Sequence, residues 1–259
     1  MPNLDWLSLL KRLSLRTGTY RLARRFERGV LRPGRLRAFQ TEIAFYRSIL
    51  PPNALCFDVG ANTGSRSEAL LTAGMRVVAF EPQVSCIPEL RTRCAAYQDL
   101  RIVAAAMGSA PAIATLFVRS SGPLSGFVAN WEGVTVAEVD VPVLTLDMAI
   151  AQFGTPFYCK IDVEGYELDV LRGLTKAVSV VSIEYHLTPD DIAKTRSCIA
   201  RLRDLGMRVV NVCPAESYAP KFPAWRPLEE LESWFPTALQ GSEGFAYGDL
   251  FFADRARRE

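Results

Sequence analysis

The sequence predicts an α/β protein built on one doubly wound, mostly parallel sheet with helices on both faces. Short apolar runs alternate with amphipathic stretches along most of the chain, which is the pattern of strands alternating with helices. One apolar run leads directly into a glycine-containing turn, as happens where parallel sheets bind nucleoside cofactors. With 259 residues, of which 49% are hydrophobic, the chain is long enough for one such domain with additions.

Residues 1–50 are expected to form a basic helical N-terminal extension. They hold eleven Lys or Arg and three acidic residues, so they carry +8 while the rest of the chain carries −6 of the overall +2. Leucines at three-residue steps predict an amphipathic basic helix: Leu4, Leu7, Leu10 and Leu13. This helix would form either a peripheral membrane contact or a solvated cap. A second helical pattern, expected to pack against the sheet, comprises Phe39, Ile43, Tyr46 and Leu50.

Residues 51–259 are expected to form the sheet domain. Seven strands are expected, near residues 55–60, 76–81, 101–106, 157–162, 180–186, 207–213 and 249–253. Helices are expected near residues 65–73, 85–97, 165–173 and 189–205. Such a sheet is covered on both faces, which explains why its strands are continuously apolar.

Two insertions are expected to interrupt this alternation, near residues 108–146 and 214–248. The first contains two strand-like runs, 114–119 and 134–146, and therefore predicts an added hairpin. The second is rich in proline and aromatic residues and is expected to be irregular. Both segments are expected either to line a ligand pocket or to cover the sheet edge with apolar side chains.

The turn after the first strand, FDVGANTGS at residues 57–65, predicts a cofactor site. Its two glycines allow a sharp bend and a close approach of a ligand to the backbone. The following helix would point its free N–H groups at the same crevice. Glu81 lies 21 residues after Gly60, where an acid after the second strand reaches ribose hydroxyls in dinucleotide-binding folds. The residues expected to contact the cofactor here are Asp58, Gly60, Ala61, Asn62, Thr63, Gly64, Glu81 and Pro82.

The composition of this turn favours a cofactor without phosphate. The dinucleotide fingerprint is G-x-G-x-x-G, but Asn62 stands where its middle glycine would admit a pyrophosphate. Asp58 adds negative charge where the pyrophosphate would lie. S-Adenosyl-L-methionine has no phosphate and carries an ammonium group, so it tolerates both features. An NAD(P)-dependent oxidoreductase remains the alternative.

Five motifs in this order resemble the FkbM-type methyltransferases: FDVGANTG, AFEPQ at 79–83, LTLD at 144–147, KIDVEGYE at 160–167 and SIEYH at 182–186. The resemblance spans roughly residues 40–254. It implies a Rossmann-like class I methyltransferase fold with S-adenosyl-L-methionine as cofactor. It also implies methyl transfer, usually to oxygen, on sugars, glycolipids or secondary metabolites. The alternative from another class is a non-catalytic subunit that binds S-adenosyl-L-methionine.

Candidate catalytic residues lie at the ends of the fourth and fifth predicted main-sheet strands. Asp162 and Glu164 are two residues apart, as are Glu184 and His186, so each pair faces one way if its strand persists. As the two strands are expected to be neighbours, three carboxylates and an imidazole would meet beside the cofactor. His186, the only histidine, is the candidate general base; the alternative is that it only satisfies local polar groups. Asp162 could hold either the cofactor's ammonium group or the acceptor hydroxyl.

Catalysis with a divalent metal ion is an alternative that ranks below metal-free base catalysis. Mg²⁺ or Ca²⁺ could use the carboxylates of Asp162, Glu164 and Glu184, but their spacing does not demand a metal, so none is assigned. The third strand is followed by no acid that could bind the adenine amino group. Backbone and apolar contacts from Ala106 and Met107 are therefore expected there.

The remaining composition limits the partners and the compartment. The six cysteines form no C-x-x-C pair and are expected to be reduced thiols in a cytoplasmic protein. No apolar run is long enough to span a membrane, and the N-terminus lacks the pattern of a signal peptide. With a net charge of +2 and no recognisable binding module, no nucleic acid is expected. A small-molecule or saccharide acceptor is expected, and the sequence allows a homodimer.

Overall fold

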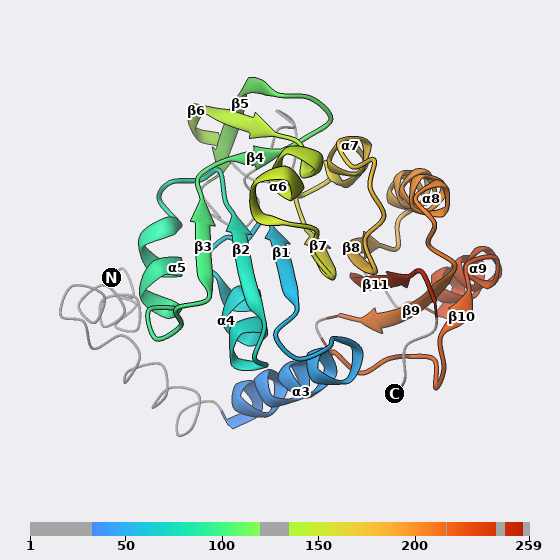
Figure 1. Cartoon of the computed structure of the whole chain (residues 1–259). Helices are drawn as coiled ribbons and strands as arrows, with labels where there is room; N and C mark the ends of the chain where they lie inside the picture. The colour runs from blue at the N-terminus through green and yellow to red at the C-terminus, as the bar shows by residue number, and fades with distance from the viewer. Residues whose placement is uncertain (1–32, 120–134, 216, 242–246, 256–259) are drawn as a thin grey trace, which may run out of the picture.

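A computed structural model describes residues 33–119, 135–215, 217–241 and 247–255. Its main sheet has eight strands in the order β10-β9-β11-β8-β7-β1-β2-β3 (Figure 1). These strands are β1 (Leu55–Val59), β2 (Arg76–Phe80), β3 (Leu100–Val103), β7 (Tyr158–Ile161), β8 (Val180–His186), β9 (Val209–Pro214), β10 (Arg226–Pro227) and β11 (Tyr247–Ala253). The seven predicted strands are all present, and the two-residue β10 is added at one edge.

The sheet is mostly parallel, as predicted. Strands β3, β2, β1, β7 and β8 pair in parallel, whereas β11 pairs antiparallel with both β8 and β9. The order of the strands reverses at β1, because the chain moves from β1 to β2 and β3 on one side and to β7 and β8 on the other. In open α/β sheets ligands bind outside the carboxyl ends of the strands at such a reversal.

Helices cover both faces of the sheet, which confirms the doubly wound arrangement. One face packs against α3 (Pro33–Ile49), α4 (Ser65–Thr72) and α5 (Ile87–Arg93). The other face packs against α6 (Leu146–Phe153), α7 (Glu167–Arg172), α8 (Pro189–Asp204) and α9 (Glu230–Gly241). Each face thus has its own hydrophobic core, and the sheet separates the two.

Helix α3 packs on the sheet through Ile43 and Tyr46, which its sequence pattern predicted, and through Phe45, which the pattern did not include. Tyr46 is completely buried, and the ring of Phe45 meets the edge of Phe251 on β11 at 4.8 Å between centroids. The basic leucine-rich stretch within residues 1–32 lies outside the described residues. Among the described helices, none is both long and apolar enough to cross a membrane. All six cysteines are buried, and none of them forms a disulfide.

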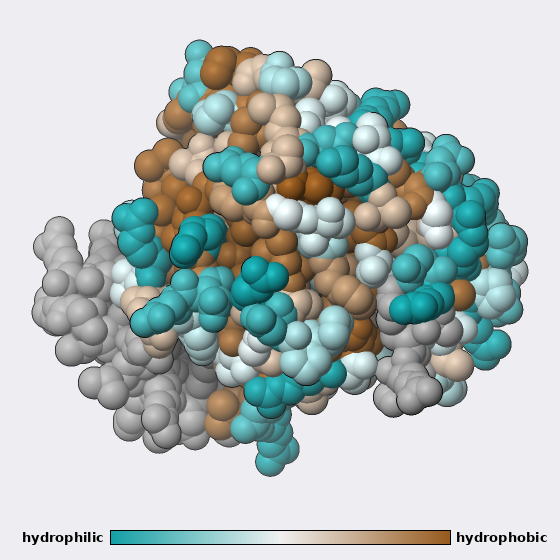
Figure 2. Space-filling view, viewed as in Figure 1, coloured by the Kyte–Doolittle hydropathy of each residue, from teal (hydrophilic) through white to brown (hydrophobic). Residues whose placement is uncertain are grey.

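The first insertion forms the predicted hairpin and extends it into a second sheet. Strands β4 (Ala106–Met107), β5 (Ala112–Arg119) and β6 (Thr135–Leu144) pair in the order β4-β6-β5. Figure 2 shows hydrophobic side chains at the surface near this small sheet, where Ile113 is 70% exposed. Strand β6 ends at Leu144, earlier than predicted, because the Thr145 hydroxyl caps the unpredicted helix α6 by accepting a hydrogen bond from Met148 N at 3.1 Å.

The second insertion is not irregular throughout, which corrects the prediction. It contains β10 and the twelve-residue helix α9. Leu231 and Phe235 of α9 are buried in the core on that face, and Trp234 meets the ring of Tyr185 edge-on at 5.6 Å. Apolar burial outweighs the unfavourable proline at position 236 inside the helix. The described part of this insertion therefore covers the outer edge of the sheet.

Candidate active site

The turn between β1 and α4 is held in a left-handed backbone conformation at three residues. The φ angles are +79° at Gly60, +49° at Asn62 and +80° at Gly64. Gly60 N and Ala61 N both donate to the carbonyl oxygen of Phe80 at the end of β2, at 3.0 Å. The turn is therefore fastened to the neighbouring strand.

The two glycines are also required by packing within the protein. A Cβ on Gly60 would overlap the carbonyl oxygen of Asp162, and a Cβ on Gly64 would lie 2.8 Å from Cγ of Leu90 on α5. The sequence explained these glycines only by the sharp bend and the close approach of a ligand. The structure adds that the end of β7 and helix α5 approach the turn too closely for any side chain there.

Glu81 supports the same turn from the end of β2. Its carboxylate accepts hydrogen bonds from Asn62 N at 2.6 Å and from Gln83 N at 2.7 Å. Burial raises the pKa of Glu81, and the two N–H donors only partly offset this effect. Each carboxylate oxygen has a second lone pair, which a ribose hydroxyl could use.

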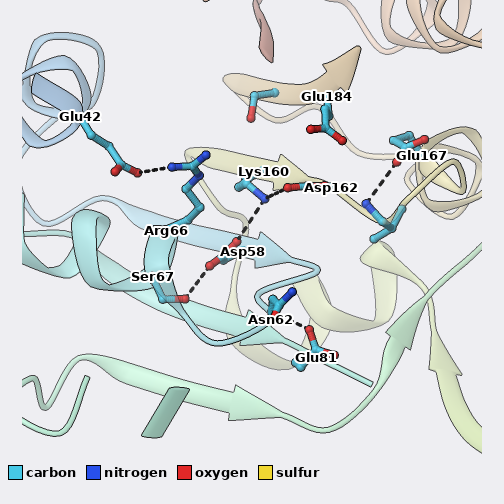
Figure 3. A network of polar contacts seen from close by, with 12 residues as sticks. Glu42, Asp58, Asn62, Arg66, Ser67, Glu81, Lys160, Asp162, Glu167 and Glu184 are labelled. Carbon is cyan, nitrogen blue, oxygen red and sulfur yellow. Dashed lines mark hydrogen bonds and ion pairs between the residues drawn. The ribbon is translucent and has the colours of Figure 1, made fainter. Parts of the chain in front are cut away.

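Asp58 is completely buried at the end of β1. One carboxylate oxygen accepts a hydrogen bond from the Ser67 hydroxyl at 2.6 Å, and the other lies 4.0 Å from Nζ of Lys160 (Figure 3). That second oxygen has no hydrogen-bond partner among the described residues. The Asp58 carboxylate therefore faces Lys160 inside the protein, and its assignment to the cofactor stays a prediction.

Lys160 joins Asp58 to Asp162 across the ends of β1 and β7. Its Nζ donates to Oδ2 of Asp162 at 2.7 Å, and its side chain is 4% exposed while that of Asp162 is 29% exposed. Burial alone would raise the pKa of Asp162, but the Lys160 ammonium group outweighs it and lowers this pKa below its ordinary value. Both groups are therefore charged at neutral pH.

Glu184 and His186 lie side by side at the end of β8. Nε2 of His186 is 3.2 Å from Oε2 of Glu184, and both side chains are about one-quarter exposed, at 24% and 23%. The hydrogen bond to Glu184 is the main cause that raises the pKa of His186 above 6.5. Strand β8 is the neighbour of β7, as expected, and Ile161 pairs with Ile183. Asp162 directly follows β7, and Glu184 is the next residue on β8, so the two are adjacent.

Glu164 does not continue the strand on which its predicted direction depended. Strand β7 ends at Ile161, and Glu164 has a φ of +54°, so the alternation of side chains no longer applies. Burial, followed by the charges of Asp162 and Glu184, raises the pKa of Glu164 to about 8. The charges of Asp162 and Glu184 thus act on this carboxyl group, although the backbone at Glu164 is left-handed and no longer follows the strand.

The structure adds residues that sequence reasoning missed. Asp249, on β11, pairs directly with Glu184 and is 7% exposed; burial raises its pKa to about 7. Arg66, on α4, pairs with Glu42 at 3.4 Å and lies over the ring of Tyr218 at 4.9 Å. Lysine inside an apolar strand was a visible signal for Lys160. No local pattern identified Asp249, because its position depends on the antiparallel register of β11.

The remaining predicted cofactor residues lie in the turn, just after β2 or in the small sheet. Thr63 accepts a hydrogen bond from Arg93 at 3.3 Å, and Ala61 is 4% exposed. Pro82 follows Glu81 and is partly exposed. Ala106 and Met107 form β4, where both side chains are buried within the protein. Their contacts with a cofactor stay predictions.

The residues of this site suit S-adenosyl-L-methionine. Asp58 has a buried oxygen without a hydrogen bond, Glu81 has free lone pairs, and the turn is lined by acids, which disfavour a diphosphate. Among the described residues, no group of three or more histidines, cysteines or acids is arranged to hold a metal ion.

Comparisons with known proteins agree with this chemistry. Residues 58–226, more than half of the chain, match the model of the methyltransferase FkbM domain. No curated protein sequence matches. The family match decides between the two cofactors in favour of S-adenosyl-L-methionine.

Solved structures similar to this chain include three methyltransferases at low identity. Precorrin-6Y C5,15-methyltransferase of Geobacter metallireducens is 14% identical, with 82% of this chain and 86% of that chain covered and a TM-score of 0.44. The TehB-like methyltransferase of Corynebacterium glutamicum is 13% identical, with 83% and 88% covered and a TM-score of 0.44. An O-methyltransferase of Thermotoga maritima is 12% identical, with 85% and 66% covered and a TM-score of 0.42. The matched domain includes the cofactor turn, β7 and β8, and the chain belongs to the FkbM family of S-adenosyl-L-methionine-dependent methyltransferases.

Proposed function

We propose that this protein is an O-methyltransferase that acts on a hydroxyl group of a small molecule or saccharide. The observation that carries the proposal is the His186–Glu184 pair at 3.2 Å on β8, one strand away from Asp162 and two strands away from the cofactor turn. An imidazole held by a carboxylate is suited to remove a proton. The neighbouring carboxylates are suited to hold acceptor hydroxyls by hydrogen bonds.

When bound, S-adenosyl-L-methionine supplies a methyl group on a positively charged sulfur. An acceptor hydroxyl is nearly neutral at pH 7 and must lose its proton as the carbon–oxygen bond forms. His186 would accept that proton, and Glu184 would stabilise the imidazolium that results. Asp162 would orient either the hydroxyl or the cofactor, since positioning is the protein's largest contribution to such a displacement.

The acceptor would reach these groups from the side of α8. Glu184 and His186 line a small cavity together with Gly165, Asp191 and Thr195. This cavity has a volume of about 30 Å³, which is room for one hydroxyl group, and an acceptor hydroxyl that entered it would lie next to the imidazole. Glu184, Asp191 and Thr195 in its wall could bind hydroxyl groups of the acceptor by hydrogen bonds.

The test is methyl transfer from labelled S-adenosyl-L-methionine to a panel of saccharides, polyols, phenols and amines. We expect methylated oxygen in the product, and His186→Ala should lower kcat by about 10²- to 10⁴-fold, the usual contribution of a general base. Glu184→Gln, which removes the carboxylate that holds His186, should also lower kcat. Its control is Glu232→Gln, which removes one carboxylate from the exposed surface of α9. Methylation of amines alone, or normal turnover of a folded His186→Ala protein, would contradict the proposal.

The pH dependence gives a second readout. His186 accepts a proton only when neutral, so kcat should rise with pH through its pKa, which Glu184 raises above 6.5. Glu184→Gln removes the main cause of that shift, and the rising limb should move to lower pH. A limb that stays in place would assign the titration to another group.

A further inference from the structure

Asp249 on β11 is an acid that sequence reasoning missed, and it stands directly opposite the catalytic pair. In the antiparallel register of β11 and β8, Asp249 pairs with Glu184, and Tyr247 pairs with His186. Directly opposed residues of such strands point to the same face of the sheet, with Cβ atoms about 4.5–5.5 Å apart. The carboxyl groups of Asp249 and Glu184 are therefore close neighbours.

Asp249 differs from the two acids beside it in its partners. Nζ of Lys160 donates to Asp162 at 2.7 Å (Figure 3), and Nε2 of His186 lies 3.2 Å from Glu184. Within the described part of the chain, the Asp249 side chain forms neither an ion pair nor a hydrogen bond, although the residue is only 7% exposed. A buried acid without such a partner favours its neutral, protonated form.

The cations near Asp249 are engaged with other acids. Arg66 pairs with Glu42 at 3.4 Å, and Lys160 is bound to Asp162. Burial raises the pKa of Asp249 to about 7, and the charges of Arg66 and Lys160 only partly offset this effect. Neither cation therefore holds Asp249 in its charged form.

The other titratable groups around Asp249 do not stabilise its charge either. Four of them are a cysteine opposite Asp249 on β9 and three tyrosines: Cys213, Tyr158, Tyr185 and Tyr218. Burial raises the pKa of each of these four groups, so all are neutral near pH 7. The remaining two are the acids Asp162 and Glu184, whose charges disfavour a charge on Asp249.

The carboxyl groups of Asp249 and Glu184 cannot both ionise without a large cost, and in such a pair one group keeps a proton. The Glu184 side chain is 23% exposed and contacts His186, whereas Asp249 is 7% exposed. The negative charge is therefore more stable on Glu184, and the proton on Asp249. A protonated carboxyl group has one O–H donor, and the Glu184 carboxylate directly opposite is an acceptor for it.

We propose that Asp249 and Glu184 share one proton, and that Asp249 is a positioning residue that keeps the negative charge on the carboxylate next to His186. The positioning role rests on the proposed function of His186 as the general base. When His186 takes the proton of an acceptor hydroxyl, the charged Glu184 stabilises the imidazolium. A proton on Glu184 would remove that charge, so Asp249 supports the pair by holding the proton itself. The proton of Asp249 is not consumed in the reaction.

The first test observes this proton by ¹³C NMR of protein labelled at the side-chain carboxyl carbon of aspartate. An ordinary aspartate has a pKa of about 3.9, so Asp249 should stand out as a carboxyl group that is still protonated at pH 6. Its signal should be absent from Asp249→Asn. In Glu184→Gln the competing carboxylate is gone, and Asp249 should titrate at least about one pH unit lower than in the wild type.

The second test follows His186, which is the only histidine and therefore gives a single imidazole titration by NMR. Asp249 is a diagonal neighbour of His186, about 7–8 Å away. In the wild type the pair shares its charge, so Asp249→Asn should lower the pKa of His186 by less than about half a unit. In Glu184→Gln, Asp249 alone carries the charge, and the same substitution should lower this pKa by about one unit.

Asp191 is the matched control, because it also acts on His186 but has a fixed charge. Its carboxylate is bound by Thr188 at 2.6 Å and by Lys194 at 3.0 Å. Burial would raise the pKa of Asp191, but these bonds outweigh it and lower the pKa below its ordinary value. Asp191→Asn should therefore lower the pKa of His186 equally with and without Glu184, within about 0.3 units.

The outcomes are distinct. Ionisation of every aspartate at pH 6, or an Asp249 titration that does not move in Glu184→Gln, overturns the shared proton. Equal effects of Asp249→Asn on His186 in the two backgrounds overturn the positioning role. If Asp249→Asn does not fold, the spectra of the wild type and Glu184→Gln still decide, because neither protein is altered at Asp249. A shared proton together with normal turnover of His186→Ala would instead contradict the role of His186 as the base.

Discussion

Replacing Gly60 with alanine tests whether the cofactor turn is fixed by the end of β7. Gly60 has a φ of +79°, and an added Cβ would overlap the carbonyl oxygen of Asp162 and lie 2.9 Å from its carbonyl carbon. Gly74 has a φ of +95° but nothing within 4 Å of an added Cβ, so Gly74→Ala is the matched control. Both variants lose about 1–2 kcal/mol through the left-handed backbone.

Only Gly60→Ala must also displace the neighbouring backbone, and overpacking of this kind costs a further ~1–3 kcal/mol. Urea denaturation should therefore show a larger loss in the free energy of unfolding for Gly60→Ala than for Gly74→Ala. S-Adenosylhomocysteine should bind more weakly only to the former, because the displaced Asp162 belongs to the site. Equal stability and equal affinity of the two variants would refute the reasoning.

Two other substitutions test the carboxyl groups of the site. Glu81→Gln places an amide N–H against a backbone N–H of the turn, which costs about 1–3 kcal/mol of stability. The variant should also bind S-adenosylhomocysteine more weakly in calorimetry. Unchanged affinity would show that Glu81 does not contact the ribose. Glu164 has a pKa of about 8 in the folded state and an ordinary value when unfolded, so the folded state binds the extra proton between these values. The free energy of unfolding of the wild type should thus fall relative to Glu164→Gln as the pH rises from 5 to 8, and parallel urea profiles of the two proteins would contradict this.

The main fold could be predicted because each core strand is a compact apolar run that ends at a recognisable turn. The ends of helices and strands were harder to predict. In the stretch from Val143 to Phe153, the apolar residues of β6 continue into those of α6, and only the cap at Thr145 separates them. Helix α9 was hidden by the prolines before it and by Pro236 within it, since its stability comes from burial against the sheet.

The positions of the candidate site residues were predicted where they depend on strand ends and missed where they depend on strand pairing. Asp162 follows β7, and Glu184 and His186 lie at the end of the adjacent parallel strand β8, so sequence order was enough to bring them together. Glu164 could not be placed, because its left-handed backbone follows the end of the strand. Asp249 lies beside Glu184 only through the antiparallel register of β11, which a single sequence does not encode locally.

A crystal structure with S-adenosylhomocysteine tests the central claim, that the turn after β1 binds the cofactor beside the catalytic pair. We predict that the ribose hydroxyls contact Glu81, that the amino group contacts Asp162, and that the sulfur faces Glu184 and His186. A ligand bound away from this turn, or one whose sulfur faces away from the end of β8, would contradict the account.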